Sequence, residues 1–600
     1  MSDSALINWR DLEFLLFELF DADALTQRPR FADHSRETFV AALDTAHAIA
    51  LEKFAPHNRA SDEHEPQFDG ERVTVIPEVA AALRAYGEAG FIAAGKDYEL
   101  GGMQLPALIA QACLALFKSA NAATASYPML TSANANVIDR FGTPEQKRKY
   151  LRPLLEGRFF GTMALTEPQA GSSLADITTR AVPNPDGTYS LSGNKIFISG
   201  GDHELTENIV HLVLAKIPGG PPGVQGISLF IVPKYRVNDD GSLGERNDVA
   251  LAGLIHKMGW RGTTSTMLSF GERGACIGEL VGEPHRGLSY MFQMMNEARI
   301  GVGMGAAMLG YRGYLASLQY AREREQGRLP GERRAEAAPV ALIAHADVRR
   351  MLIAQKAYVE GGLALCLYAA RLVDDQRTAG DDATRQSAAL LLDLLTPVVK
   401  SWPSQWCLEA NSLAIQIHGG YGYTREYPVE QFYRDNRLNM IHEGTHGIQA
   451  LDLLGRKIRQ HDGQALELLS REIDATIGAA REHADLGEEA DALDAAQREL
   501  RSTLAVLLPA LRDRPEAALA LAPNFLETFG HIVVAWLWLR QAVAASRGLP
   551  QAQAGDAAFY RGKIQACRWF FRHELPKVQV HHALMRAVDE TVLGMQAEWF

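Results

Sequence analysis

The chain has 600 residues, of which 47% are apolar and 22% are charged, and its net charge is −12. This composition is typical of a globular protein with several domains. The acidic balance argues against nucleic acid as a general partner, because phosphate binding needs a basic surface. The five cysteines lie far apart and never form a CxxC pair, which argues against a disulfide framework or a structural zinc site.

The N-terminal residues are acidic and resemble neither a secretion signal nor an Arg-rich transit peptide. The longest apolar runs, such as residues 532–539, are shorter than the roughly 20 residues that a membrane helix needs. We therefore expect a cytoplasmic protein without an integral membrane segment.

Apolar residues recur at helical spacing through most of the first 160 residues. This pattern predicts a helical extension over residues 1–36 and a helical domain over residues 37–160. The helices of this domain are expected at residues 76–86, 107–119 and 144–155, the last of them with Pro144 at its first position.

From residue 161 the apolar residues alternate and β-branched residues become frequent, which is typical of strands. Turns rich in Asn, Asp, Gly and Pro separate the alternating runs. We predict an all-β domain over residues 161–282, with strands at residues 188–199, 209–217, 226–235 and 264–277.

Helical spacing returns after residue 282, and we predict a helical bundle over residues 283–460 and an additional helical domain over residues 461–600. Because helices and strands are segregated, the pattern favours an α+β protein of several domains over a doubly wound sheet. The bundle helices are expected at residues 288–328, 346–374, 386–395 and 404–418. Those of the last domain are expected at residues 493–508, where Pro509 ends the helix, 524–545 and 557–571.

Residues 442–446 have the sequence HEGTH, which matches the HExxH pattern of zinc peptidases. Such a site needs both histidines one turn apart on a helix, but a glycine stands between them and disfavours a helix interior by about 1 kcal/mol relative to alanine. Thr445 fits better as the N-cap of a helix over residues 448–454. Glu467 and Glu472, which are possible further ligands, belong to a separate predicted helix. We therefore expect no metal site.

Three further motifs allow both a structural and a functional interpretation. Residues 301–306 match GxGxxA but follow no predicted strand, so helix packing explains them better than a dinucleotide site. Residues 166–173, TEPQAGSS, form either a plain connection or a loop whose N–H and hydroxyl groups hold a flat ligand rich in carbonyl groups. Residues 320–328 contain several arginines and form either a solvated helix end or a clamp for phosphate.

Taken in order, these motifs resemble those of the acyl-CoA dehydrogenase family. The loop ALTEPQAGSS is similar to the family's flavin loop, and KIFISGG at residues 195–201 is similar to a strand signature. NEAR at residues 296–299, AREREQGR, QIHGGYGYTREYPVEQFYRD and IHEGTHGIQALDLLGRK resemble the later signatures. The terminal sequences WRDLEFLLFELF and LGMQAEWF are similar to a bacterial subgroup with an extra C-terminal helical domain, which includes 3-methylmercaptopropionyl-CoA dehydrogenases and broad-range fatty acyl-CoA dehydrogenases.

The resemblance implies an N-terminal helical domain, a middle β-barrel domain, a C-terminal four-helix bundle and the extra helical domain. It implies FAD-dependent α,β-dehydrogenation of an acyl-CoA thioester to the trans-2-enoyl-CoA. Glu443 matches the family's base, which takes the α-proton while the β-hydrogen leaves as hydride to flavin N5. The resemblance further implies that electrons pass to electron-transfer flavoprotein and that the protein is a homodimer or a dimer of dimers. An acyl-CoA oxidase that uses oxygen is the alternative, and a zinc hydrolase is a distant one.

The resemblance also assigns positions for cofactor and substrate. It places Arg324 on the FAD phosphate across a dimer, and Gln416, Gly419 and Gly420 on the FAD of the neighbouring subunit. The other cofactor positions are Leu165, Thr166, Gly171, Ser172, Phe197, Ser199 and Thr445. The substrate positions are Ser172, Arg299, His442 and Gly444.

Several positions depart from the family's usual residues. Phe197 stands where tryptophan is usual, Ser199 where threonine is more frequent, and Ser173 where aspartate is usual. His442 stands where an aromatic residue is common, and it is expected to shape the acyl pocket. None of these changes removes the chemistry, but Phe197 and His442 leave the acyl preference open among methylthio, branched, aryl and plain alkyl chains.

Overall fold

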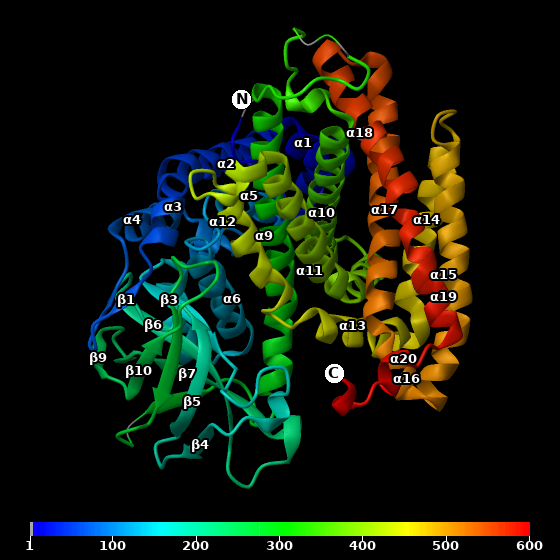
Figure 1. Cartoon of the computed structure of the whole chain (residues 1–600). Helices are drawn as coiled ribbons and strands as arrows, with labels where there is room; N and C mark the ends of the chain where they lie inside the picture. Colours follow the sequence, from blue (N-terminus) through cyan, green and yellow to red (C-terminus); the bar gives the residue numbers. More distant parts are fainter. Residues whose placement is uncertain (1–3, 275, 333, 335) are drawn as a thin grey trace. The chain divides into compact units, whose positions relative to one another are not determined.

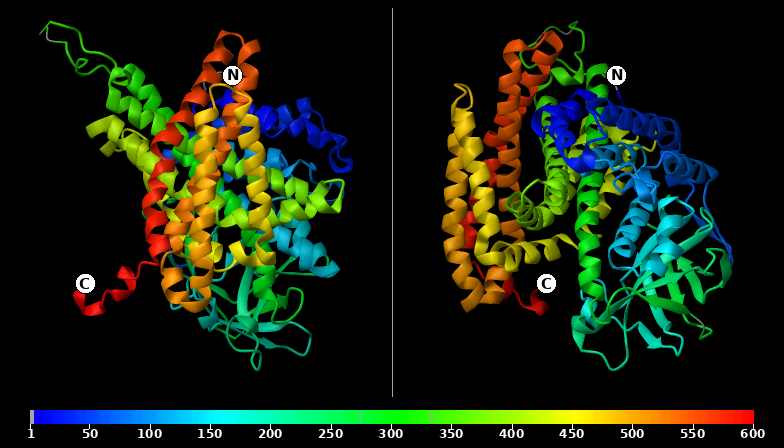
Figure 2. Two further views of the ribbon diagram at one scale, coloured as in Figure 1. Left: turned by 90° about the vertical axis from the view of Figure 1, so that its right-hand side faces the viewer. Right: turned by 180° about the vertical axis from the view of Figure 1, so that it is seen from behind.

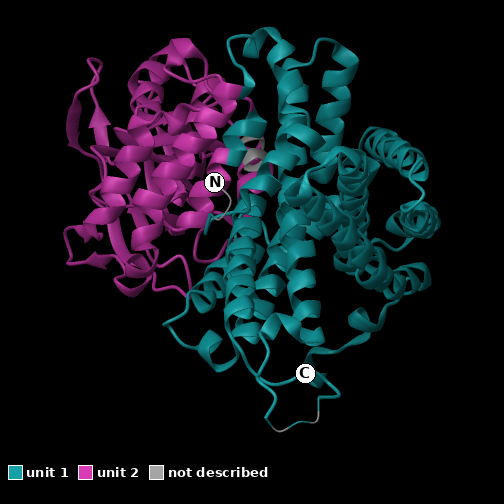
Figure 3. Ribbon diagram, turned by 90° about the horizontal axis from the view of Figure 1, so that it is seen from above, with its two compact units in different colours: residues 1–36, 107–112, 302–600 teal, residues 37–106, 113–301 magenta. Residues whose placement is uncertain are grey.

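The computed structural model describes residues 4–274, 276–332, 334 and 336–600, with the backbone but not the side chains of residues 293–297. Two compact units make up the chain (Figure 3). The first unit contains residues 1–36, 107–112 and 302–600, and the second contains residues 37–106 and 113–301.

Helices precede the sheet, as predicted (Figure 1). Thr143 and Gln146 form a capping box, in which Gln146 N donates to Thr143 Oγ1 at 3.2 Å and Thr143 N donates to Gln146 Oε1 at 3.1 Å. The predicted helix start at Pro144 is confirmed, but a π-helical turn (Lys147–Leu151) interrupts the helix. The helices are α2 (Arg36–Ile49), α3 (Asn58–Glu63), α4 (Pro77–Glu88), α5 (Ala107–Ala120), α6 (Ser126–Phe141), α7 (Pro144–Gln146) and α8 (Arg152–Leu155).

The predicted β-barrel of the second unit is confirmed by its strand order. Hydrogen-bonded neighbours follow the order β10-β11-β5-β12-β7-β6-β3, and β4 pairs with both β5 and β6. Because β4 joins these two strands, the ring β5-β12-β7-β6-β4 is closed. The predicted strand at residues 264–277 is instead two strands joined by a turn. The strands of this sheet are β3 (Phe159–Ala164), β4 (Arg180–Pro183), β5 (Tyr189–Ser199), β6 (Asn208–Lys216), β7 (Ile227–Pro233), β10 (Val249–Leu254), β11 (Ser265–Phe270) and β12 (Ile277–Leu280).

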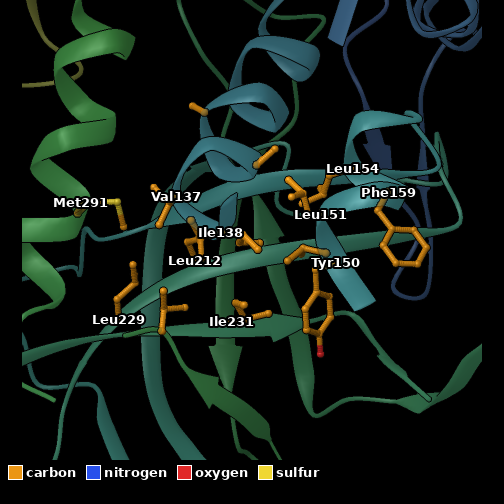
Figure 4. Packing of buried hydrophobic residues seen from close by; sticks show 14 of the residues in the cluster. Val137, Ile138, Tyr150, Leu151, Leu154, Phe159, Leu212, Leu229, Ile231 and Met291 are labelled. Atoms are coloured by element: carbon orange, nitrogen blue, oxygen red, sulfur yellow. The ribbon is translucent and has the colours of Figure 1, made fainter. Parts of the chain in front are cut away.

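The central strands β6 and β7 are buried on both faces, because alternate side chains point to opposite sides of a sheet. Val213 pairs with Phe230, and both belong to the core on one face. Leu212 and Ile231 belong to the core on the other face, which contains Val137 of α6 (Figure 4). Burying an apolar side chain of this size stabilises the fold by about 1.5–3 kcal/mol. This second core therefore fastens α6 to the barrel.

One lysine of the second unit is buried without an anion beside it among the described residues. Lys118 of α5 is fully buried, and among the described residues no group accepts a hydrogen bond from its Nζ. The ammonium lies 4.7 Å from the centre of the Trp260 ring, which offers only a cation–π contact. Burial lowers the pKa of Lys118 to about 7. The protonated side chain therefore destabilises the fold.

Lys118→Met is expected to stabilise the protein at neutral pH, because the variant buries no charge. Between pH 7 and about 10.5 the unfolded chain binds a proton at Lys118 that the folded chain does not. The stability of the wild type therefore rises with pH in this window, by up to about 1.4 kcal/mol per pH unit, and the advantage of the variant shrinks. Denaturation midpoints of both proteins at several pH values test this, with the exposed Lys53→Met as control. A variant less stable than the wild type at pH 7 contradicts it.

Long helices form the bundle of the first unit. They are α9 (Gly287–Glu323), which continues from the second unit, α10 (Ala346–Thr378) and α11 (Asp382–His418), followed by the shorter α12 (Val429–Arg437) and α13 (His446–Gly455).

Two predictions about the bundle helices are wrong. The helices expected at residues 386–395 and 404–418 are a single helix, α11, which contains Pro397 and Pro403. Each proline removes one helical hydrogen bond, but the residues between them are buried and keep the chain helical. The helix expected at residues 288–328 ends at Glu323, because the following segment pairs with residues 340–342 instead.

The last helices of the first unit pack side by side (Figure 2). The prediction that Pro509 ends its helix is wrong, because the apolar face continues past it to the buried Leu511. Helix α17 is buried almost all round and includes the fully buried Trp536 and Trp538, as is typical of a central helix. None of the described helices is long and apolar enough to cross a membrane. The helices after residue 463 are α14 (Gln464–Arg481), α15 (Gly487–Asp513), α16 (Pro515–Ala520), α17 (Ala522–Gly548), α18 (Ala554–His573), α19 (Val578–Ala587) and α20 (Thr591–Gly594).

A charge cluster joins three distant parts of the first unit. It consists of the fully buried Asp11, Glu360 and Lys563 and the half-buried Lys356. Lys563 of α18 contacts Asp11 of α1 (Trp9–Glu13) and donates to Glu360 Oε2 of α10 at 2.8 Å. Lys356 contacts the other oxygen of Glu360. Burial would raise the pKa of Glu360, but the two ammonium groups outweigh it and lower the pKa. The four charges balance, so the cluster ties the N-terminal extension to the bundle and to the last domain.

Candidate active site

In the second unit, the loop of residues 165–173 is organised by the buried carboxylate of Glu167. This carboxylate accepts from the N–H and hydroxyl groups of Thr178 at 2.7 and 2.8 Å, and from those of Thr179 at 3.0 and 2.6 Å. Lys195 Nζ pairs with it at 2.9 Å. Burial would raise the pKa of Glu167, but Lys195 and these hydrogen bonds lower it to about 2. Glu167, whose role the sequence analysis missed, therefore fixes the loop in its ionised form.

Four of the predicted FAD residues lie together at the end of β5. Lys195 Nζ donates to Leu165 O, and Ile196 N donates to Thr166 O, both at 2.9 Å. Leu165 and Thr166 therefore run beside Phe197 and Ser199. Phe197 has a φ of +60° and is 62% exposed. An exposed phenyl ring in this uncommon conformation, beside the half-buried hydroxyl groups of Thr166 and Ser199, suits a flat aromatic ligand. These residues fit the isoalloxazine ring of FAD.

Gly171 and Ser172, also predicted at the flavin, lie exposed in the same loop. A Cβ built at Gly171 would have no atom within 4 Å, so the packing of the chain does not require glycine here. Ser173, which stands where the family usually has aspartate, donates to Asp176 Oδ2 at 2.5 Å. Its hydroxyl therefore supports the loop from within.

The predicted base, Glu443, lies in a tight turn of the first unit. Its φ is +53°, and Gly444 follows with a φ of +89°. Gln449 Nε2 donates to Glu443 O at 3.1 Å, and Lys400 Nζ donates to Gly444 O at 2.7 Å. A Cβ at position 444 would lie 2.5 Å from Gln449 Nε2. Glycine is therefore required by the turn itself, besides leaving room for a substrate. The Glu443 side chain is half-buried.

The helix after this turn begins at His446, and the predicted N-cap is confirmed. Thr445 is extended (φ −60°, ψ 162°), and its hydroxyl accepts from Ile448 N at 3.4 Å. His442 precedes the helix, so the two histidines of HEGTH do not share a helical face. Burial, with the charges of Lys400 and Arg437, lowers the pKa of His446 to about 4. No group of three or more potential metal ligands lies within the described ranges.

A chain of buried asparagines, absent from the predictions, leads to His442. Asn411 Nδ2 donates to Leu309 O at 2.9 Å, and Asn436 Nδ2 donates to Asn411 Oδ1 at 2.7 Å. Asn439 Nδ2 donates to Asn436 Oδ1 at 3.0 Å, and Asn439 Oδ1 lies 3.0 Å from His442 Nε2. This network fixes the residue before Glu443 to the bundle. In the sequence, the spacing of three residues between Asn436, Asn439 and His442 could have predicted that these side chains are neighbours.

The other predicted cofactor residues of the first unit lie at the end of α11. Gln416, Gly419 and Gly420 are exposed there. The rings of Tyr320 and His418 stack with centres 4.3 Å apart, and Arg324 N donates to the Tyr320 carbonyl at 2.9 Å. Arg324 therefore lies at the same end of the bundle as the two glycines, as a shared ligand site requires. Arg299, predicted at the substrate, is buried in the part of α9 that belongs to the second unit.

The predicted residues thus form three groups: the end of β5 with its loop, the turn at residues 442–445, and the end of α11. Family models for the N-terminal, middle and C-terminal domains of acyl-CoA dehydrogenases match residues 36–158, 162–272 and 285–458. A fourth model, "Acetyl-CoA dehydrogenase C-terminal like", matches residues 469–596. The chain belongs to the acyl-CoA dehydrogenase family, whose members are oxidoreductases.

Two relatives match over nearly their whole length. The chain is 35% identical to the 3-methylmercaptopropionyl-CoA dehydrogenase of Ruegeria pomeroyi, over 97% of this chain and 98% of the relative. It is 34% identical to the broad-specificity linear acyl-CoA dehydrogenase FadE5 of Mycobacterium tuberculosis, over 99% of both chains. A crystal structure of an acyl-CoA dehydrogenase complexed with FAD from Bacillus anthracis is similar in fold, with a TM-score of 0.75 and 21% identity over 97% of this chain and 93% of that one.

Proposed function

We propose that the protein catalyses FAD-dependent α,β-dehydrogenation of an acyl-CoA thioester, with Glu443 as the base that removes the α-proton. The observation that carries this proposal is the Glu443 turn. A half-buried carboxylate lies directly before a capped helix, and buried donors hold its backbone. Membership in the acyl-CoA dehydrogenase family supports the proposal.

The chemistry demands such a base. A proton next to a thioester is weakly acidic, so the carboxylate that removes it must be close and poorly solvated. Negative charge then develops on the thioester oxygen, and N–H groups near the start of α13 are suited to stabilise it. Removal of the α-proton, orientation of the thioester and exclusion of water are thus the tasks of this chain's own residues.

FAD is the cofactor of the proposed reaction. Leu165, Thr166, Phe197 and Ser199 would hold its ring, with Gly171 and Ser172 at the ring edge and Thr445 at the adenosine. Arg324, Gln416, Gly419 and Gly420 would hold the FAD of a second subunit, so we propose a homodimer. The chemistry that FAD supplies when bound is acceptance of the hydride from the β-carbon.

We propose 3-methylthiopropanoyl-CoA or a linear fatty acyl-CoA as the substrate, with electron-transfer flavoprotein as the electron acceptor in the cytoplasm. The names of the two full-length relatives support these substrate classes. Arg299, His442, Gly444 and Ser172 are the proposed substrate contacts. Because His442 is bonded to Asn439, it forms a fixed wall rather than an adaptable one.

A panel of acyl-CoA thioesters tests this function. We expect the purified protein to show an oxidised flavin spectrum that one substrate class bleaches under anaerobic conditions. In air, a dehydrogenase should turn over slowly unless electron-transfer flavoprotein is added, whereas rapid formation of hydrogen peroxide would identify an oxidase. A protein that binds no flavin, or whose flavin no acyl-CoA reduces, contradicts the proposal.

A further inference from the structure

Lys400 places a buried positive charge directly on the turn that carries Glu443. The side chain is fully buried in α11, and its Nζ donates to Gly444 O at 2.7 Å. A neutral donor would satisfy a peptide carbonyl at a lower desolvation penalty, as Gln449 does for the neighbouring carbonyl. Lys400 therefore brings a positive charge to the turn, where an uncharged donor would also satisfy the carbonyl group.

The two bonds determine where the peptide N–H groups of the turn point. In a planar trans peptide the N–H and C=O groups point in opposite directions. With Glu443 O turned toward Gln449 and Gly444 O turned toward Lys400, the N–H groups of Gly444 and Thr445 face the opposite side. Within the described part of the chain, neither of these N–H groups donates to a backbone carbonyl group. Both are thus available to a ligand.

We propose that Lys400 is a positioning residue of the dehydrogenation reaction, an inference that rests on the proposed function. Its bond to Gly444 O holds the left-handed Glu443–Gly444 turn, which aims the carboxylate and the two free N–H groups. The ammonium also polarises the peptide to which it bonds, so that the Thr445 N–H becomes a stronger donor toward the FAD that the proposed function places beside Thr445. The same charge favours the ionised form of the base.

The test compares Lys400→Met with the wild type as FAD-loaded proteins, per mole of bound flavin. We expect the anaerobic rate of flavin reduction by the best acyl-CoA of the panel to fall by about 10- to 100-fold, with a much smaller change in KM. The acidic limb of the pH–rate profile should move to higher pH, because the Glu443 carboxylate loses a stabilising charge. Hydrogen exchange at residues 441–449 should become faster.

Two further variants distinguish positioning from mere packing. Lys400→Arg keeps the charge and should restore part of the rate and the native pH profile. Lys457→Met removes another buried lysine, whose partner Asp393 lies in α11, as Lys400 does. This variant should be less stable than the wild type, but its pH–rate profile should not move. If Lys400→Met does not fold, Lys400→Arg must still differ from the wild type in rate or profile.

Two negative results have different meanings. If the wild type is active and the Lys400 variants show the same rate and the same pH–rate profile, only the role of Lys400 is overturned. A wild type whose flavin no acyl-CoA reduces overturns the proposed function, and the role of Lys400 with it.

Discussion

Replacing Glu443 with glutamine is expected to slow flavin reduction by acyl-CoA about 1,000-fold or more, because the amide cannot accept the α-proton. The FAD content should not change. The turn is held through the backbone carbonyls of Glu443 and Gly444, which the substitution leaves in place. Glutamine also has nearly the same size as glutamate. Anaerobic rapid mixing with the best acyl-CoA, monitored by flavin absorbance, measures the effect.

Glu467→Gln is the matched control for this experiment. Glu467 is exposed on α14, so the same chemical change there should leave the rate of flavin reduction within about twofold of the wild type. If HEGTH were instead the site of a zinc hydrolase, the Glu443 variant would lose hydrolysis, and no flavin signal would be seen in either protein.

If acyl-CoA bleaches the flavin of the Glu443 variant at the native rate, another group is the base.

Local signals in the sequence were sufficient to predict the start of the helix that follows Glu443. Thr445 has the side chain of an N-cap, and glycine before it disfavours a continuous helix, so the HEGTH motif was correctly interpreted as a cap. The capping box at Thr143 and the alternation in β6 and β7 are equally local. In each case neighbouring residues alone determine the backbone conformation.

Predictions failed where packing between distant segments decides the structure. Pro397 and Pro403 are strong local breakers, yet α11 continues through both because its middle is buried in the bundle. The partners of Glu443 were missed for the same reason. Lys400 and Gln449 meet the turn from two different helices, and no periodic pattern pairs a lysine with a carbonyl oxygen 44 positions away. Their roles became visible only in three dimensions.

Lys563→Met is expected to have the largest effect on stability, lowering the free energy of unfolding of the first unit by about 3–5 kcal/mol. The substitution removes the ammonium that contacts Asp11, Glu360 and Gln541. The fully buried carboxylates of Asp11 and Glu360 then share one ammonium, that of Lys356. Of these two carboxylates, Lys356 contacts that of Glu360. Among the described residues, the Asp11 carboxylate then keeps one hydrogen-bond donor, the hydroxyl of Tyr311 at 2.8 Å, and the favourable charge of Lys356.

Because Asp11 belongs to α1, the loss should appear first as release of the N-terminal extension. Hydrogen exchange of residues 5–20 and the denaturation midpoint measure the local and the global effect. Arg561→Met, an exposed cation lost from the same helix α18, should change the midpoint little. Adding Asp11→Asn to Lys563→Met should restore part of the stability, because the buried charges balance again. If the single variant is as stable as the wild type, or if the double variant is less stable than the single one, unbalanced charge does not govern this contact.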